Sequence, residues 1–412
     1  MYSIMEYKGI DYLRNKLLQH RQRVLTRYDY YHQKISTGHM ASLNATKDAM
    51  REVLGWCTKA VDTLADRLDF DTFDNDNFDV NQIFTLNNRD VLIDSAILSA
   101  AIASCSFVSI SAAIDGYPRL QVIDGGNATG TIDLMTGLLT EGYAVLERDE
   151  YQMPKIEAYY TAGQTTYYRH DGTKPYVEYN KSPYAMLVPI IYRPDAVRPF
   201  GHSRISRACM DATLAAQRTL TRSETSAEFY SYPQKYVLGL SEDAEFNNRL
   251  ASASSFLRFD KDSDGDKPTV GQFTTQSMTP YAEQLKLFAS IFAAETGLTL
   301  DDLGFTASNP SSAEAIRASH ENLRLTAKKA QHTFGIGLLN VGYLACCLRD
   351  NTAYDRKAFA DIKPIWQPIF EPDAAALSGV GDAILKINQA VPDYLGAKNI
   401  KHLTGMESDK DV

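Results

Sequence analysis

The longest helical pattern in the chain follows a turn that contains Pro199 and Gly201. Ser203 is a suitable N-cap, and no helix breaker follows it until Pro233, so the pattern predicts a helix over 203–231. At about 100° per residue, small and apolar side chains form a narrow packing seam along one arc of this helix. The seam consists of Ile205, Cys209, Ala212, Ala216 and Leu220.

The opposite arc of the same helix is a basic edge with one acidic residue, Asp211, among its arginines. The edge consists of Arg204, Arg207, Arg218 and Arg222. At about 1.5 Å per residue the helix is roughly 40 Å long, and its small seam lets another helix approach closely. The residues alone are equally consistent with an ordinary surface helix whose charged face is solvated.

Short alternating runs of polar and apolar residues, separated by turn signals, extend from Phe107 to Tyr192 and predict a β-rich lobe. The uncharged segment from Ser95 to Ala113 is long enough to span a membrane, but its helical spacing changes midway to strand alternation. We therefore expect a helix that leads into a half-buried strand, and no membrane span.

Helical spacing predicts four further helices, at 2–35, 45–68, 280–296 and 312–349. The last has a capping box at Ser311 and Glu314, and its Gly335, Gly337 and Gly342 indicate close backbone contacts. The fold class that follows from these patterns is α+β.

The insert between the two helices, 232–276, has short strand-like runs. Within it, Asp260–Gly265 imitates a calcium-binding loop, but Gly271 stands where the bidentate glutamate belongs. We interpret this stretch as a hairpin tip.

Composition narrows the possible functions. The chain has 412 residues, 44% of them hydrophobic, and a formal charge of −9, which argues against a protein that reads DNA sequence but suits one that DNA slides past. The five cysteines show no paired spacing, so we expect reduced, buried thiols. The first residues lack an apolar core segment, and we expect no signal peptide.

Candidate catalytic and ligand motifs all fail on specific residues. Gly201–Ile205 imitates a hydrolase nucleophile elbow, but the branched Ile205 stands where the sharp turn needs glycine. Gly125–Gly130 lacks the lysine of a phosphate loop, and no histidines have metal-site spacing. An acidic run is better interpreted as a solvated surface than as a metal site; it consists of Asp66, Asp69, Asp71, Asp74, Asp76 and Asp79. We expect no enzyme, no cofactor and no bound metal.

The loop from Gly297 to Pro310 alternates apolar residues with two carboxylates. Its candidate functional residues are Leu298, Leu300, Asp301, Asp302 and Leu303. The loop either buries its leucines in its own subunit and leaves the aspartates in water, or it contacts other subunits.

The segment PFGHSRI and the block from Thr296 to Ile316, together with the order of the elements between them, resemble the portal proteins of long-tailed double-stranded DNA phages. The resemblance covers nearly the whole chain. It implies a portal fold with a β-rich wing, a two-helix stem, a small α/β clip insertion, a long wing helix and a short helical crown. The implied parts are a wing at 1–202, a stem helix at 203–231, a clip at 232–277, a second stem helix at 278–296, a tunnel loop at 297–311, a long wing helix at 312–349 and a crown at 350–412.

The resemblance further implies a ring, expected to be a dodecamer, at the portal vertex of a capsid, assembled in the host cytoplasm. The implied partners are the terminase large subunit, a head-completion adaptor, the major capsid and scaffolding proteins, and double-stranded DNA that passes non-specifically, with no membrane. The stem arginines would pair with acids of the next subunit or touch passing phosphates. The alternative function is a minor capsid or other structural virion protein without a DNA channel.

Overall fold

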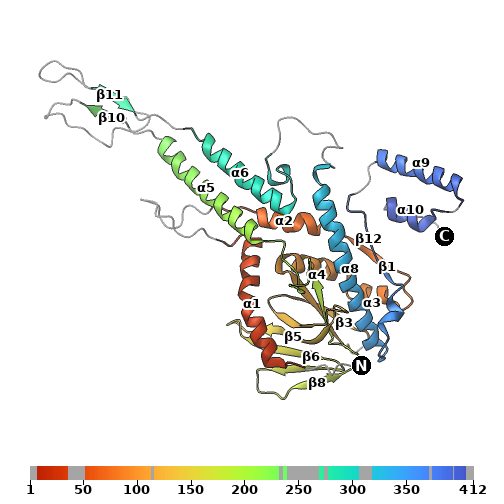
Figure 1. Ribbon diagram of the computed structural model, residues 1–412. Helices are drawn as coiled ribbons and strands as arrows, with labels where there is room; N and C mark the ends of the chain where they lie inside the picture. The colour runs from red at the N-terminus through yellow and green to blue at the C-terminus, as the bar shows by residue number, and fades with distance from the viewer. Residues whose placement is uncertain are drawn as a thin grey trace, which may run out of the picture. The chain divides into compact units, whose positions relative to one another are not determined.

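The computed structural model describes residues 7–35, 52–112, 116–231, 235–238, 269–272, 277–305, 318–370, 374–392 and 394–404 (Figure 1). The chain divides into two compact units. Unit 1 comprises 1–35, 55–210 and 293–412, and unit 2 comprises 36–54 and 211–292.

Unit 1 contains a five-stranded antiparallel sheet in the order β4-β5-β6-β7-β8. Its strands are β4 Ala128–Ile132, β5 Leu139–Arg148, β6 Pro154–Thr161, β7 Gln164–Arg169 and β8 Tyr176–Tyr179. The alternating pattern had predicted a β-rich lobe here, and the structure confirms it. The pattern missed β4, whose small and polar residues (ATGTI) give no alternating apolar signal.

A three-stranded antiparallel sheet, in the order β3-β2-β9, forms the centre of unit 1. Its strands are β2 Cys105–Ser111, β3 Arg119–Asp124 and β9 Leu187–Ile191. Helix α4, Arg89–Ala103, leads directly into β2 and packs on this sheet, as the change of spacing predicted. Among the described residues, no helix is long and apolar enough to cross a membrane.

Strand β2 is buried on both faces, which corrects the expectation of a half-buried strand. On one face the Ser106 hydroxyl donates to the Ala96 carbonyl of α4 at 2.7 Å, and on the other Ser109 bonds the Tyr160 hydroxyl of β6 at 2.8 Å. Serines in a buried strand are tolerated because each hydroxyl has a partner.

Helix α1, Ile10–Tyr31, is attached to the five-stranded sheet by apolar packing and two buried carboxylates. Leu13 and Leu17 pack with β5 residues. Glu141 accepts hydrogen bonds from the backbone N–H groups of Lys8 and Gly9, at 3.0 and 3.1 Å. These bonds fix the start of the helix to the sheet.

The second carboxylate, Glu157, accepts hydrogen bonds from Arg14 at 2.6 Å, from His170 at 2.8 Å and from the Tyr143 hydroxyl. Burial tends to raise the pKa of Glu157, but these hydrogen bonds outweigh it and hold the pKa below its ordinary value. The charged form is therefore the native one.

A long-range strand pair closes the other side of unit 1. β1 Phe70–Asp74 pairs with β12 Lys363–Trp366, although more than two thirds of the chain separates them in sequence. The prediction of a helical crown at 350–412 is therefore wrong at 363–366, which form a strand. It is right for α9 Ala374–Ala390 and α10 Ala397–Thr404, which are helices.

The helix predicted at 45–68 is shorter in the structure. Residues 52–55 are not helical, and α2 runs over Trp56–Ala65, while 36–51 lie outside the described residues. The Asp76 carboxylate from the acidic run accepts from the backbone N–H groups at the start of α3, Val80–Leu86. No metal-holding cluster of three or more side chains occurs in the described ranges.

Helix α8, Glu321–Arg349, packs on β9, β12 and α3, and its interior glycines lie at these contacts. A Cβ at Gly335 would lie 2.6 Å from Pro364, one at Gly337 would lie 2.9 Å from Ile190, and one at Gly342 would overlap Val80. The predicted close contacts are confirmed. The capping box at Ser311 and Glu314 lies outside the described residues.

Unit 2 contains most of two helices and one strand pair. The helices are α5 Arg207–Ser231 and α6 Thr279–Thr296, and the strands are β10 Lys235–Leu238 and β11 Thr269–Gln272. The imitation calcium loop at 260–265 lies outside the described residues.

Candidate functional site

The segment PFGHSRI forms a junction in unit 1, and its last three residues, Ser203, Arg204 and Ile205, are buried. Gly201 has φ +76°, and a Cβ there would overlap the Tyr192 carbonyl oxygen. The same oxygen accepts a hydrogen bond from the His202 N–H at 2.9 Å. Only glycine fits this close approach in the left-handed region.

The junction satisfies the last carbonyl groups of α4, which have no partner within their own helix. The Arg204 N–H donates to the Ala101 carbonyl at 2.8 Å, and the Ser203 hydroxyl donates to the Ile102 carbonyl at 2.6 Å. Arg27 of α1 donates to the next carbonyl, of Ala103, at 3.3 Å. The sequence motif is therefore a cap for a helix about a hundred residues earlier in the chain.

The Arg204 side chain extends this junction to two more helices. Its Nε donates to the Ala60 carbonyl of α2 at 3.1 Å, and an Nη donates to the Thr296 carbonyl at the end of α6 at 2.6 Å. Arg204 is only 8% exposed. The prediction that Arg204 belongs to the basic edge of the helix is wrong. Arg204 has helical spacing from Arg207, but its backbone is not helical, because α5 begins only at Arg207.

The helix cap is also one turn later than predicted. Helix α5 begins at Arg207, and the Ser206 hydroxyl accepts the Cys209 N–H at 3.2 Å, so Ser206 rather than Ser203 occupies the N-cap position. The same Ser206 hydroxyl lies 2.9 Å from a Glu295 carboxylate oxygen of α6. Ile205 is buried but precedes the helix, so it is not part of the helical seam.

On the exposed turn before the junction, His202 donates to the Asp195 carboxylate at 2.6 Å. This bond and the backbone N–H groups of Arg198 and Val197 lower the pKa of Asp195 to about 2. The turn is thereby held by one charged side chain.

Within unit 2, helices α5 and α6 lie side by side (Figure 1). Thr219 donates to Gln284 at 3.2 Å, and Ser226 bonds Tyr281 at 2.8 Å. Ala212 and Ala216 of the predicted seam are 5% and 0% exposed within one chain, so the structure assigns them to packing inside the chain. Cys209 is buried as well, and Leu220 is half-buried.

Three of the four predicted arginines do form an exposed edge on α5. Arg207, Arg218 and Arg222 are exposed, as is Asp211 between them. No ion pair among the described residues includes these three arginines.

The loop after α6 is folded on itself up to Phe305. Gly297 and Gly304 have φ +69° and +89°, and residues 301–303 form a short 3-10 helix. The Asp302 carboxylate accepts both the N–H and the hydroxyl of Thr299, each at 2.9 Å. Asp302 is thus a turn-forming residue, whereas Asp301 is exposed.

The leucines of this loop also differ in exposure. Leu298 is buried, at 7% exposure, while Leu300 and Leu303 are half-buried. The self-burying interpretation therefore holds for Leu298. Residues 306–317 lie outside the described part of the chain, so the rest of the predicted loop is not placed.

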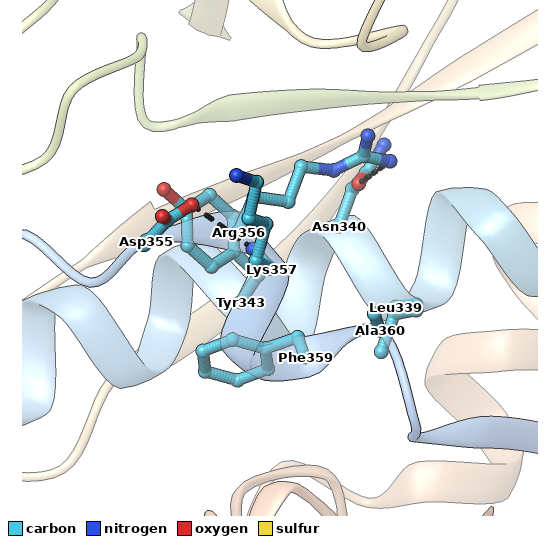
Figure 2. A pocket seen from close by; sticks show the side chains of 8 residues that line it. All are labelled: Leu339, Asn340, Tyr343, Asp355, Arg356, Lys357, Phe359 and Ala360. Carbon is cyan, nitrogen blue, oxygen red and sulfur yellow. Dashed lines mark hydrogen bonds between the residues drawn. The ribbon is translucent and has the colours of Figure 1, made fainter.

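A surface pocket of about 350 Å³ lies between α8 and the segment that follows it (Figure 2). Figure 2 shows Arg356 reaching over the pocket to Asn340, whose Oδ1 accepts its hydrogen bond at 3.0 Å. Asp355 accepts from the Lys357 N–H at 3.0 Å, so the polar groups on this wall bond one another. No nucleophile with an adjacent base lines it.

The comparisons with known proteins point to one family. The family model described as phage portal protein, SPP1 Gp6-like, matches residues 10–383. Two portal proteins, from Mycobacterium phage D29 and Mycobacterium phage L5, are 27% and 26% identical over 307 residues, which is 68% of this chain. The chain spans 62% of the length of each of these relatives.

Solved structures with a distant likeness come from gene transfer agent particles. The neck of the native particle, computed with C12 symmetry, has a TM-score of 0.48 at 14% identity, covering 85% of this chain and 90% of that one. The virion of the native particle gives a TM-score of 0.44 at the same identity and coverage.

Proposed function

This chain belongs to the phage portal protein family, SPP1 Gp6-like, and we propose that it forms a ring at one capsid vertex through which double-stranded DNA is packaged and ejected. Family membership confirms the resemblance found in the sequence. It supports a structural virion protein of the portal vertex rather than an enzyme. The single observation that carries the proposal is the family match over residues 10–383, a range that includes the junction, α5, α6 and the loop.

In the proposed ring, α5 and α6 are the stem, the insert at 232–277 is the clip, and unit 1 supplies the wing. The clip would bind the terminase large subunit during packaging and a head-completion adaptor afterwards, while the wing meets the major capsid and scaffolding proteins. The mycobacteriophage relatives that share the name portal protein support this assignment. We propose that the ring is a dodecamer, as the family resemblance implies.

The exposed arginine edge of α5 would pair with acids of the next subunit. A conduit that bound phosphates tightly would slow the passage of DNA. The net charge of −9 also disfavours tight binding of DNA. Replacing Arg218 and Arg222 with glutamine tests this, because inter-subunit pairing predicts weaker rings with normal packaging. Stable rings with altered packaging would assign these arginines to DNA.

The loop at 297–311 would line the narrowest part of the channel. Buried Leu298 and the Asp302–Thr299 bonds anchor it, and exposed Asp301 presents a carboxylate that discourages tight binding of phosphate. Such an anchored, acidic collar can hinder backward slippage of DNA without holding it.

The experiment replaces residues 299–305 by a Gly-Ser link and assembles heads with the variant. We expect normal rings but impaired DNA packaging or retention. The matched control replaces the surface turn at 171–174 in the same way and should package normally. Full-length, stably retained genomes in heads with the altered loop would contradict this role.

A further inference from the structure

Helix α1 presents a row of basic side chains at the spacing of one helix face. The row consists of Lys16, Arg23 and Arg27. His20 lies between them, but burial lowers its pKa, so it adds no charge near neutral pH. Arg198, from the turn before the junction, adds to it, because Arg27 lies in the electrostatic field of both Arg23 and Arg198. We call the four cations, Lys16, Arg23, Arg27 and Arg198, the basic face.

Over the ranges that the structure describes, ion pairs do not neutralise the basic face. Among the described residues, no carboxylate forms an ion pair with Lys16, Arg23, Arg27 or Arg198. Lys16 instead donates to the Gly130 carbonyl at 2.6 Å and lies 4.9 Å from the Phe200 ring centre. Arg23 is exposed and extends from the helix without a charged partner.

A second surface of unit 1 has the opposite charge. Asp66 follows α2, Asp69 precedes β1, and Asp94 lies on α4. We call these three exposed residues the acidic face. Of the nearby cations, Arg67 stacks over the Phe370 ring at 4.6 Å and Arg89 pairs with Asp90 at 2.8 Å. Lys59, Arg67 and Arg89 offset only part of the negative charge, because the pKa of Asp66 and of Asp69 stays raised.

Each face is electrostatically unfavourable by itself. Loss of surrounding water and the neighbouring carboxylates raise the pKa of Asp66, Asp69 and Asp94. Burial and neighbouring cations lower the pKa of Lys16 and Arg27. Both sets of charges would gain from an opposite charge brought to them from outside.

We propose that the basic face of one copy of this chain binds the acidic face of the next copy. The proposal rests on the proposed ring, in which every subunit must offer its two neighbours two different surfaces. Unit 1 carries both faces. The basic face follows α1, whereas the acidic face lies on α4, after α2 and before β1, so one chain offers two different surfaces. Charge complementarity of this kind fixes register and excludes wrong pairings.

The test reverses each face separately and then both together. The acidic-face variant carries Asp66→Lys and Asp94→Lys, and the basic-face variant carries Arg23→Glu and Arg198→Glu. Matched controls reverse exposed residues elsewhere, through Glu150→Lys with Asp361→Lys and through Lys174→Glu with Lys181→Glu. Mass photometry measures the ring fraction over a concentration series, and tryptophan fluorescence verifies that each variant is folded.

We expect each single-face variant to need at least about tenfold more protein for assembly, because like charges then face each other. The controls should assemble like the unaltered chain. The chain with both faces reversed should regain assembly, and so should an equal mixture of the two single-face variants. Raising the salt concentration should weaken assembly of the unaltered chain.

Unaltered assembly of folded single-face variants would overturn the contact while leaving the proposed ring intact. So would failure of the doubly reversed chain to assemble. If the basic-face variant assembled normally but lost binding to a short DNA duplex, nucleic acid would be the occupant and the proposal would be wrong. If the unaltered chain formed no ring, the proposed function itself would fail, and this contact with it.

Discussion

The junction at 201–206 and the helix that follows it use the same residue types for opposite purposes. Arg204 is buried and donates to two backbone carbonyls, whereas Arg218 and Arg222, on the same predicted arc, are exposed. The junction is determined by hydrogen bonds to distant helix ends, while the helix exposes its charges. Helical spacing therefore predicts which side chains share one face of a helix. Whether such a side chain is buried and holds the fold together depends on partners that are distant in sequence.

The largest effect is expected from removing the Arg204 guanidinium. Arg204→Met leaves the Ala60 and Thr296 carbonyls without a charged donor in a buried site, which should cost about 3 kcal/mol of unfolding free energy. Urea denaturation followed by tryptophan fluorescence measures it well, since both tryptophans, Trp56 and Trp366, belong to unit 1. Arg222→Met is the control and should change stability by less than about 0.5 kcal/mol. Equal urea midpoints for the two variants would show that buried Arg204 contributes no more to stability than exposed Arg222, which would contradict the comparison.

A somewhat smaller effect is expected at Gly201. Gly201→Ala forces a Cβ against the Tyr192 carbonyl in a left-handed conformation, for an expected loss of about 2 kcal/mol. Gly172→Ala is the matched control, because Gly172 also has positive φ, +85°, but open space around it. The control should lose about 1 kcal/mol from conformation alone. If both variants lost the same unfolding free energy, the close approach of Gly201 to the Tyr192 carbonyl would not contribute to the cost of the substitution.

The start of the helix gives the next comparison. Ser206→Ala removes the side chain that caps α5 and should cost about 1 kcal/mol. Ser206→Asp, which can cap equally well, brings a second carboxylate towards Glu295 and should recover only part of this loss. Hydrogen exchange of the first α5 amides measures the effect locally, and unchanged protection in Ser206→Ala would show that the cap is elsewhere.

The smallest effect concerns the exposed turn before the junction. Asp195 has a pKa of about 2, first because His202 donates to it and then because of backbone N–H groups. A depressed native pKa means that its contribution to stability is complete above the unfolded pKa and is lost as pH falls towards about 2. NMR titration should show the pKa of Asp195 rising towards its ordinary value in His202→Ala. No change would mean that the backbone alone determines it.

The sequence allowed the family, the β-rich lobe and the tight glycines of α8 to be predicted, because each depends on local spacing or on a continuous motif. It did not show that Ser203 and Arg204 cap α4, since their acceptors lie about a hundred residues away. The pairing of β1 with β12 escaped for the same reason. The structure buries Ala216 of the predicted seam, but periodicity shows only that a face is buried and not which chain buries it.

The central claim is that copies of this chain close into a ring around a channel. Single-particle imaging of the purified protein tests it most directly. The account predicts closed rings with a central opening and, in symmetry-free averages, twelve equivalent subunits. Particles without an opening, or monomers and dimers at every concentration tested, would contradict it.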